Sequence, residues 1–246
     1  MKQAILEDPE TRDIDVSIIH NLSTAHLYLQ LKGIEKDGCL PQLKKDPYLE
    51  ITYVPTKATI QKNKRTKYVN CFGEDSRDIE ASIDKFRKNT PLRKNAYKLA
   101  KAIIDGELGY GIYIHSNDFQ IGKTYLANAI VNALVDKGLH GSFLFTPSLA
   151  RQAKEFNEIE QRIRYINDGE FLVIDDIGAE HKSSWFRSEV LMPLLQHRLA
   201  FKKLTIFTSN YSIEELTSLY GDSVDTRRLT TRILELAEVV KIDDSA

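Results

Sequence analysis

The chain has 246 residues, a hydrophobic content of 42% and a charged content of 28%, which is the composition of a globular protein that buries a core. Its formal net charge of −1 excludes an overall basic field that would attract nucleic acid, so any DNA contact requires a local patch. No apolar run reaches the roughly 18 residues that cross a membrane, and the polar N-terminus does not resemble a secretory signal. We therefore expect a cytoplasmic protein without membrane contact.

Residues 1–60 predict a small α+β region. The helical spacing of apolar residues predicts a helix over residues 1–32, and glycine and proline predict a loop over residues 37–47. Alternating large and polar residues predict a short strand over residues 48–55. The lysine-rich segment that follows has little apolar content and indicates a linker or a solvated helix, and we assign residues 61–90 to a linker.

From residue 91 onward, apolar strands alternate with helices, and we assign residues 91–246 to one domain. The expected helices cover residues 90–106, 125–138, 147–168, 183–200 and 225–240, and the expected strands cover residues 109–116, 141–146, 170–180 and 202–212. Strands that are apolar on both faces are typical of a parallel sheet covered by helices on each side, so the predicted fold class is α/β. Pro193 is expected to bend its helix because proline lacks a backbone donor.

The turn between the first strand of this domain and the next helix contains a phosphate-loop pattern, G-x-x-x-x-G-K-[ST], that lacks its first glycine. The residues expected to bind a nucleotide are those of the pattern and its next neighbour: Asn117, Asp118, Phe119, Gln120, Ile121, Gly122, Lys123, Thr124 and Tyr125. A strand before the loop and a helix after it are the context that such a loop requires. The helix start would direct backbone N–H groups at an anion, Lys123 would contact the β- and γ-phosphates, and Thr124 would offer its hydroxyl to Mg²⁺. Taken alone, the pattern also fits a surface turn that happens to contain a lysine.

The missing glycine is replaced by Asn117. Glycine is used where the backbone needs a positive φ, and asparagine tolerates that conformation best, so we expect the replacement to be accepted for this reason. Gln120 occupies a free position of the pattern and breaks no rule.

A second motif follows in a later strand, where four apolar residues precede two aspartates (Phe171–Gly178, FLVIDDIG). Asp175 is expected to hold Mg²⁺ together with Thr124, and Asp176 to polarise the attacking water. A strand end that simply meets solvent would look similar. The presence of both motifs, in order and on the expected elements, predicts a Mg²⁺-dependent phosphate-loop ATPase.

Two further features indicate catalytic groups. Asn210 follows the fourth strand, and we expect it beside the γ-phosphate, where it would orient the attacking water; the alternative is an asparagine that forms a turn. Arg227, Arg228 and Arg232 crowd the last helix, and an arginine there could reach the γ-phosphate of a neighbouring subunit. The alternative for these arginines is a solvated basic surface.

Residues 173–199, 207–216 and 227–237 together resemble the bacterial helicase loaders of the DnaI type and, more distantly, of the DnaC type, which are AAA+ ATPases. The likeness covers about residues 90–240 and, weakly, residues 15–60. The resemblance implies a weak ATPase that binds the hexameric replicative helicase and helps to load it onto single-stranded DNA during primosome assembly. ATP binding, more than turnover, would set the state of the loader. The resemblance also implies an AAA+ core, possible ATP-dependent self-association, and Arg228 as the arginine that acts on a neighbouring subunit, with Arg232 as second choice.

The sequence departs from this family in its N-terminal part and at its end. Relatives carry a cysteine-rich zinc site in a longer N-terminal domain, whereas here Cys39 alone stands near that place and Cys71 lies elsewhere. We therefore expect no zinc, two free thiols, and a shortened helicase-docking region within residues 1–60. Relatives also continue into an arginine-containing tail beyond the position of Ala246, so we expect hydrolysis to be weak.

The resemblance also indicates a DNA contact. Arg151 and Lys154 lie on the helix after the second strand, which resembles a single-strand-binding element that would hold the backbone without reading sequence. The alternative is an ordinary solvated helix face.

Two other functions fit the same core. The first is an IstB-like transposition helper that directs a transposase, although the segment at residues 183–190 favours a helicase loader. The second is a nucleotide-gated adaptor that binds ATP and a partner with negligible hydrolysis. A small-molecule kinase is disfavoured because no lid or substrate-binding segment is visible.

Overall fold

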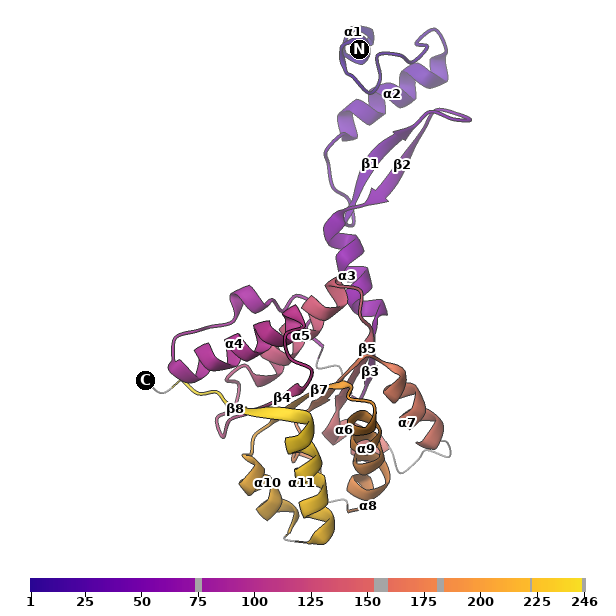
Figure 1. Cartoon of the computed structure of the whole chain (residues 1–246). Coiled ribbons are helices and arrows are strands. Elements are labelled where there is room, and N and C mark those ends of the chain that lie inside the picture. Colours follow the sequence, from indigo (N-terminus) through magenta and orange to yellow (C-terminus); the bar gives the residue numbers. More distant parts are fainter. Residues whose placement is uncertain (74–76, 153–158, 181–183, 222, 245–246) are drawn as a thin grey trace. The chain divides into compact units, whose positions relative to one another are not determined.

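The computed structural model describes residues 1–73, 77–152, 159–180, 184–221 and 223–244 (Figure 1). The chain divides into two compact units, Met1–Asn63 and Lys64–Ala246, and each has its own packing. In the part of the chain that the structure describes, no helix is both long and apolar enough to span a bilayer.

The first unit is built from two helices and a β-hairpin. Its elements before α3 are α1 (Lys2–Glu7), α2 (Ile19–Leu31), β1 (Cys39–Lys44) and β2 (Glu50–Pro55). Four buried residues form its core: Ile5, Ile14, Ala25 and Leu49. The predicted helix over residues 1–32 was wrong in its middle, because Asp8 and Asp15 accept hydrogen bonds from nearby backbone N–H groups (Glu10 and Ser17) and so favour turns there.

The loop predicted for residues 37–47 was also wrong, because β1 occupies most of it and pairs antiparallel with β2. Pro41 lies within β1, opposite Tyr53. A proline is accepted there because each strand of a two-stranded hairpin is an edge strand with one unpaired side.

The segment assigned to a linker has regular structure. α3 (Lys57–Lys67) buries no side chain, as expected of the solvated helix that was one interpretation of this segment. β3 (Val69–Phe72) pairs parallel with β5 and forms one edge of the main sheet. The part of the chain before residue 90 therefore contributes a strand to the second unit.

The described strands of the second unit form one six-stranded sheet in which every pairing is parallel. In spatial order the strands are β3 (Val69–Phe72), β5 (Gly141–Phe145), β6 (Phe171–Asp175), β7 (Leu204–Ser209), β4 (Gly111–His115) and β8 (Ala237–Lys241). The predicted parallel sheet flanked by helices is confirmed. β8 was missed, since we expected the last helix to run to residue 240; the β-branched residues Val239 and Val240 instead pair with β4.

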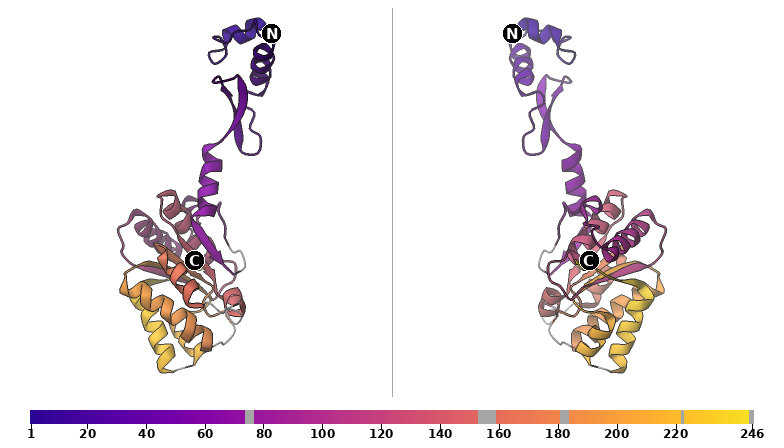
Figure 2. Two further views of the ribbon diagram at one scale, coloured as in Figure 1. Left: turned by 90° about the vertical axis from the view of Figure 1, so that its right-hand side faces the viewer. Right: turned by 90° about the vertical axis from the view of Figure 1, so that its left-hand side faces the viewer.

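Helices cover both faces of this sheet (Figures 1 and 2). They are α4 (Pro91–Asp105), α5 (Lys123–Asp136), α6 (Thr146–Gln152), α7 (Ile159–Asp168), α8 (Ser184–Phe186), α9 (Met192–Ala200), α10 (Ile213–Tyr220) and α11 (Val224–Leu236). Successive strand residues face opposite cores: Ile112 and Ile114 pack with α4 and α5, whereas Tyr113 packs with the helices of the other face. This alternation explains why the strands are apolar throughout.

Two predicted helices differ in detail. Residues 153–158 of the helix predicted over 147–168 lie outside the described residues, and α6 and α7 flank them. In the helix predicted over 183–200, a π-helical turn (Arg187–Leu191) separates α8 from α9. Pro193 is the second residue of α9 and directly follows this π-helical turn, to which it can donate no backbone N–H.

The strand order positions the site. β4 and β7 are neighbours in the sheet, and the connections that leave them run in opposite directions, from β4 across to β5 on one side and from β7 across to β8 on the other, so the direction of the chain reverses between β4 and β7. In open parallel sheets, ligands bind outside the carboxyl ends of the strands at such a reversal. The residues that follow β4, β6 and β7 meet at this edge.

Candidate functional site

The loop after β4 leads directly into α5, and its backbone is held in unusual conformations at two positions. Gly122, the N-cap of α5, has φ 100°, and Gln120 has φ 55°. Asn117 is not among the residues with positive φ, so our reason for expecting it to be accepted was wrong. Its side-chain Nδ2 instead donates to Glu215 Oε1 at 2.8 Å. Asn117 therefore ties the start of the loop to the first turn of α10.

Lys123 lies at the base of this loop and is buried. Its Nζ donates to the carbonyl oxygens of Ser116 at 3.1 Å and Asp118 at 2.8 Å. Burial lowers the pKa of Lys123, and the carboxylates of Asp176, Asp118 and Asp175 oppose that shift. A lysine ammonium has three donors, so these two contacts leave one for an anion.

The two predicted metal ligands lie together. Thr124 Oγ1 donates to Asp175 Oδ1 at 2.9 Å, and Thr208 Oγ1 donates to the same oxygen at 2.7 Å. The two hydroxyls hold the buried carboxylate in one orientation beside the loop. Hydroxyl and carboxylate oxygens are the donors that Mg²⁺ prefers, and Mg²⁺ usually takes few protein ligands when phosphates supply the others. The donors fit that ion, whereas the described residues contain no group of three or more His, Cys, Asp or Glu side chains that could hold a metal alone.

Asp176 and Asn210 also meet at this edge. Asn210 Nδ2 donates to Asp176 Oδ1 at 3.0 Å, and the backbone N–H of Asp176 donates to Thr208 Oγ1 at 2.9 Å. Asp176 has φ 59°, a conformation that aspartate tolerates better than most residues. Burial raises the pKa of Asp176, whereas Lys123 lowers it. A carboxylate with a raised pKa in a cleft has the properties of a general base.

These side chains line one cavity of about 400 Å³, which we call the phosphate-loop cavity. The described residues around it are Phe119, Gln120, Ile121, Gly122, Lys123, Thr124, Tyr125, Phe145, Asp175, Asp176 and Asn210. The structure thus brings together all the predicted site residues except Asn117, Asp118 and Arg228. A second cavity of about 330 Å³ shares Gln120, Ile121, Gly122 and Tyr125 with it and is otherwise lined by Lys85, Phe86, Arg87 and Arg93.

Sequence reasoning missed three residues that arrange this site: Thr146, Thr208 and Glu215. Thr146 Oγ1 lies 3.0 Å from the carbonyl oxygen of Asp175 and 2.8 Å from that of Asp176, and so supports the turn between them. Thr208 orients Asp175 from the neighbouring strand, and Glu215 holds Asn117. The sequence offered one signal for Thr208, its position two residues before Asn210. It offered none for Thr146 or Glu215, because their contacts join segments that no motif connects.

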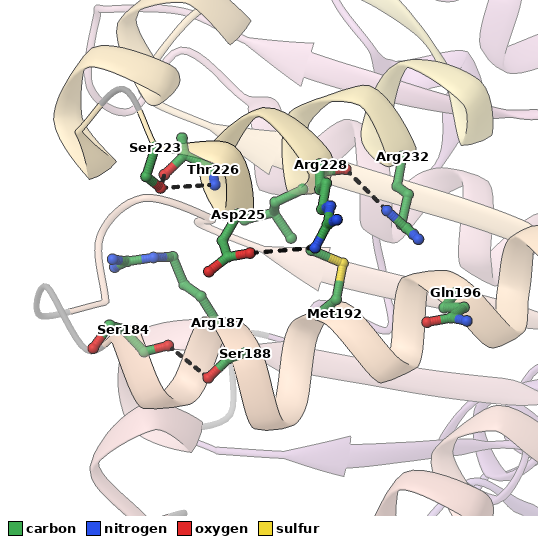
Figure 3. Close-up of a pocket in the computed structure, with 11 residues that line it drawn as sticks. Ser184, Arg187, Ser188, Met192, Gln196, Ser223, Asp225, Thr226, Arg228 and Arg232 are labelled. Atoms are coloured by element: carbon green, nitrogen blue, oxygen red, sulfur yellow. Dashed lines mark hydrogen bonds and ion pairs between the residues drawn. The ribbon is translucent and has the colours of Figure 1, made fainter.

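Arg228 lies elsewhere, on α11, in a cavity of about 480 Å³ between α11 and the segment from α8 to α9 (Figure 3). We call this the arginine cavity; its described lining consists of Ser184, Arg187, Ser188, Met192, Gln196, Ser223, Asp225, Thr226, Arg228, Leu229 and Arg232. Arg228 Nη1 lies 3.7 Å from Asp225 Oδ1, and its side chain is 65% exposed. Figure 3 shows Arg228 directed from α11 toward Met192. Arg228 therefore does not line the phosphate-loop cavity of its own chain.

Of the two residues expected to contact DNA, Lys154 lies outside the described residues. Arg151 is exposed on α6, and its Nη2 donates to Ser148 Oγ at 2.9 Å.

Comparisons with known proteins find similarity to ATP-binding proteins and to helicase loaders. The family model for IstB-like ATP-binding proteins matches residues 118–246. The replicative helicase loader DnaI of Bacillus subtilis (strain 168) is 33% identical over 145 residues, which are 55% of this chain and 46% of that protein. The replicative helicase loader DnaC of Escherichia coli (strain K12) is 25% identical over 154 residues, which are 59% of this chain and 62% of that protein. The matches thus span about half to three fifths of these relatives' length.

Among solved structures, a crystal structure of DnaI is similar with a TM-score of 0.65 and 29% identity. The likeness covers 72% of this chain and 98% of that one. This likeness supports the α/β architecture described above.

Proposed function

This chain belongs to the family of IstB-like ATP-binding proteins, and from that premise we propose that it is a weak, Mg²⁺-dependent ATPase that loads a replicative helicase. The observation that carries the ATPase proposal is the convergence of Lys123, Thr124 and Asp175 in one cavity. The matches to two curated helicase loaders support the loading role.

In the phosphate-loop cavity, the phosphates of ATP would lie against the N-terminus of α5, where backbone N–H groups and the helix dipole favour an anion. The third proton of Lys123 is available to a phosphate oxygen. Thr124 and Asp175 would hold Mg²⁺, which when bound neutralises phosphate charge. The base would occupy the second cavity, which continues from the loop along Phe86 and Arg87.

For hydrolysis, Asp176 would accept the proton of the attacking water, and Asn210 would keep the Asp176 carboxylate in place through the hydrogen bond already formed. No arginine of the described chain lines the phosphate-loop cavity. Arg228, exposed on α11, would therefore act on the nucleotide of a neighbouring subunit. This requires ATP-dependent self-association, and it makes hydrolysis slow in a single chain.

The helicase would dock on residues 1–60, and α3 would lead to the ATPase domain, to whose sheet β3, within the segment assigned to a linker, already belongs. The first unit exposes many large apolar side chains for its size, including Ile18, Ile19, Leu27, Tyr48 and Tyr53. Exposed apolar surface beyond scattered single residues is typical of a protein-binding site. Single-stranded DNA would contact the exposed Arg151 of α6, weakly and without sequence preference.

Light scattering on a size-exclusion column tests this function. The protein would be mixed with the replicative helicase of its host, with and without Mg-ATP, alongside the Lys123→Ala variant. We expect a defined complex whose amount depends on ATP, and we expect Lys123→Ala to lose that dependence.

Absence of any complex under both conditions would contradict the loader. A complex with a transposase in a parallel run would then support the transposition helper. A helicase complex with no measurable hydrolysis, even with single-stranded DNA present, would support the adaptor instead.

A further inference from the structure

Arg93 is buried directly beside the phosphate loop. It lies in the first turn of α4, is 1% exposed, and its Nη2 donates to the carbonyl oxygen of Ile121 at 2.6 Å. Its Nε donates to the carbonyl oxygen of Asp243 at 3.3 Å and lies 2.7 Å from Asp244 Oδ1. One guanidinium thus joins α4, the phosphate loop and the segment that follows β8.

The contact with Ile121 sets the direction of a peptide group. In a trans peptide the carbonyl and the following N–H point to opposite sides, so a carbonyl of Ile121 held by Arg93 directs the N–H of Gly122 away from Arg93. Arg93 lines the second cavity and not the phosphate-loop cavity, whereas Gly122 lines both. The N–H of Gly122 is thereby turned toward the side on which the phosphates would bind.

The loop needs such support because its own conformation is costly. Gln120 has φ 55°, and a residue with a Cβ in this left-handed region costs about 1–2 kcal/mol. Gly122, with φ 100°, loses more backbone freedom on folding than other residues do. A charge-assisted hydrogen bond from a buried guanidinium is among the strongest that a protein forms, and it opposes both costs.

We propose that Arg93 is the positioning residue of the phosphate loop, holding the Ile121–Gly122 peptide in the anion-binding orientation. The proposal rests on the proposed nucleotide site and adds a residue that no motif identifies. It also couples nucleotide affinity to the segment after β8, because the same guanidinium binds Asp243 and Asp244.

A second buried arginine provides a matched control. Arg198 is fully buried and also donates to main-chain carbonyl oxygens, those of Gly169 at 3.3 Å, Glu170 at 3.1 Å and Leu204 at 2.6 Å. None of these partners is among the described residues that line the phosphate-loop cavity. Replacing either arginine by alanine should lower the melting temperature. Phosphate binding should weaken in Arg93→Ala and not in Arg198→Ala.

Isothermal titration calorimetry with Mg-ATP and with Mg-tripolyphosphate tests the proposal on the full chain. For Arg93→Ala we expect Kd to rise by roughly 10-fold or more for both ligands, as for a lost hydrogen bond from a charged group. Arg198→Ala should leave both affinities unchanged at a temperature where it is folded. Millimolar guanidinium should restore affinity to Arg93→Ala, because it fills the place of the missing side chain.

If Arg93→Ala does not fold, Arg93→Lys and Asp244→Asn replace it. Lysine keeps the charge but lacks the planar fork that presents separate donors to Ile121 and Asp243, and Asp244→Asn removes the charge that holds the guanidinium; we expect weaker binding in both, with the smaller effect in Asp244→Asn.

Unchanged affinity in these variants would overturn the proposal. So would a loss for Mg-ATP without a loss for Mg-tripolyphosphate, since that pattern assigns Arg93 to the base. If the unaltered protein binds neither ligand and matches Lys123→Ala, the proposed function itself fails, which is a different result.

Discussion

The phosphate-loop cavity and the arginine cavity differ in how their charges are balanced. At the phosphate-loop cavity, the pKa of Lys123 is influenced by three carboxylates, those of Asp175 and Asp176 in the cavity and that of Asp118 in the loop. In the arginine cavity, three arginines meet Asp225, the single carboxylate among its described lining residues. The first set of groups has an excess of negative charge, which suits a bound cation, whereas the second has an excess of positive charge. The comparison teaches that the second cavity suits a negative group from another molecule, as a subunit-bridging arginine requires.

The largest expected effect concerns Lys123, the cation of the phosphate-loop cavity. Lys123→Ala should weaken Mg-ATP binding by roughly 100-fold or more, because several charge-assisted hydrogen bonds to phosphate are lost together. Calorimetric titration measures this directly. Arg228→Ala serves as control and should bind Mg-ATP as the unaltered protein does; equal losses in both variants would remove the distinction between the cavities.

The next effect concerns the arginine cavity. Arg228→Ala should lower ATP turnover on the order of 10-fold or more while leaving affinity unchanged, since an arginine that acts across subunits stabilises charge in the transition state. Turnover per chain measured at rising protein concentration tests this. A mixture of Arg228→Ala and Lys123→Ala should recover part of the turnover, because the second variant supplies the arginine to the first. No recovery, or a loss confined to binding, would place Arg228 outside the reaction.

A third prediction separates stability from catalysis at Asp176. Its pKa is raised in the folded protein by burial, so the folded chain holds this proton more tightly than the unfolded chain does. The resulting contribution to stability is present at pH values below the unfolded pKa and is lost as pH rises through the folded pKa. At neutral pH the buried negative charge of Asp176 destabilises the folded protein. Asp176→Asn should therefore raise the melting temperature while it abolishes ATP turnover.

Melting temperatures of the unaltered protein and of Asp176→Asn, measured from pH 3 to pH 8, test this pH dependence. The two curves should converge in acid, and a lower melting temperature for Asp176→Asn at neutral pH would contradict the prediction.

The smallest effect concerns the backbone of the loop. Gln120→Gly removes the cost of a side chain at φ 55° and should tighten Mg-ATP binding by up to about fivefold. Asn117→Gly restores the glycine of the motif but removes the bond to Glu215, so it should give no gain. A gain from Asn117→Gly and none from Gln120→Gly would show that the loop conformation in solution differs from the one described.

Much of the fold and of the site could be predicted because both depend on local patterns. Strands apolar on both faces belong inside an α/β domain, and Thr90, Pro91 and Gly106 mark the ends of α4 as expected. The N-terminal unit was harder, since its core of four buried residues produces little periodic signal and its side chains favour turns as readily as helices. The edge strands β3 and β8 were missed because a short strand with one paired side has only partial burial, and so lacks the continuous apolar run of the central strands.

The sequence by itself determined the order of β4, the phosphate loop, α5 and the aspartate-ended β6 along the chain, and it placed Lys123, Thr124, Asp175, Asp176 and Asn210 at one carboxyl edge. Parallel strands share that edge, whereas the order of the strands in the sheet, with β6, β7 and β4 side by side, brings these residues together. The tertiary structure alone decided the contacts that arrange this group: Thr208 with Asp175, Glu215 with Asn117, and Arg93 with Ile121. Each joins segments distant along the chain, and such contacts depend on the final packing of whole elements, which no local pattern of residues records.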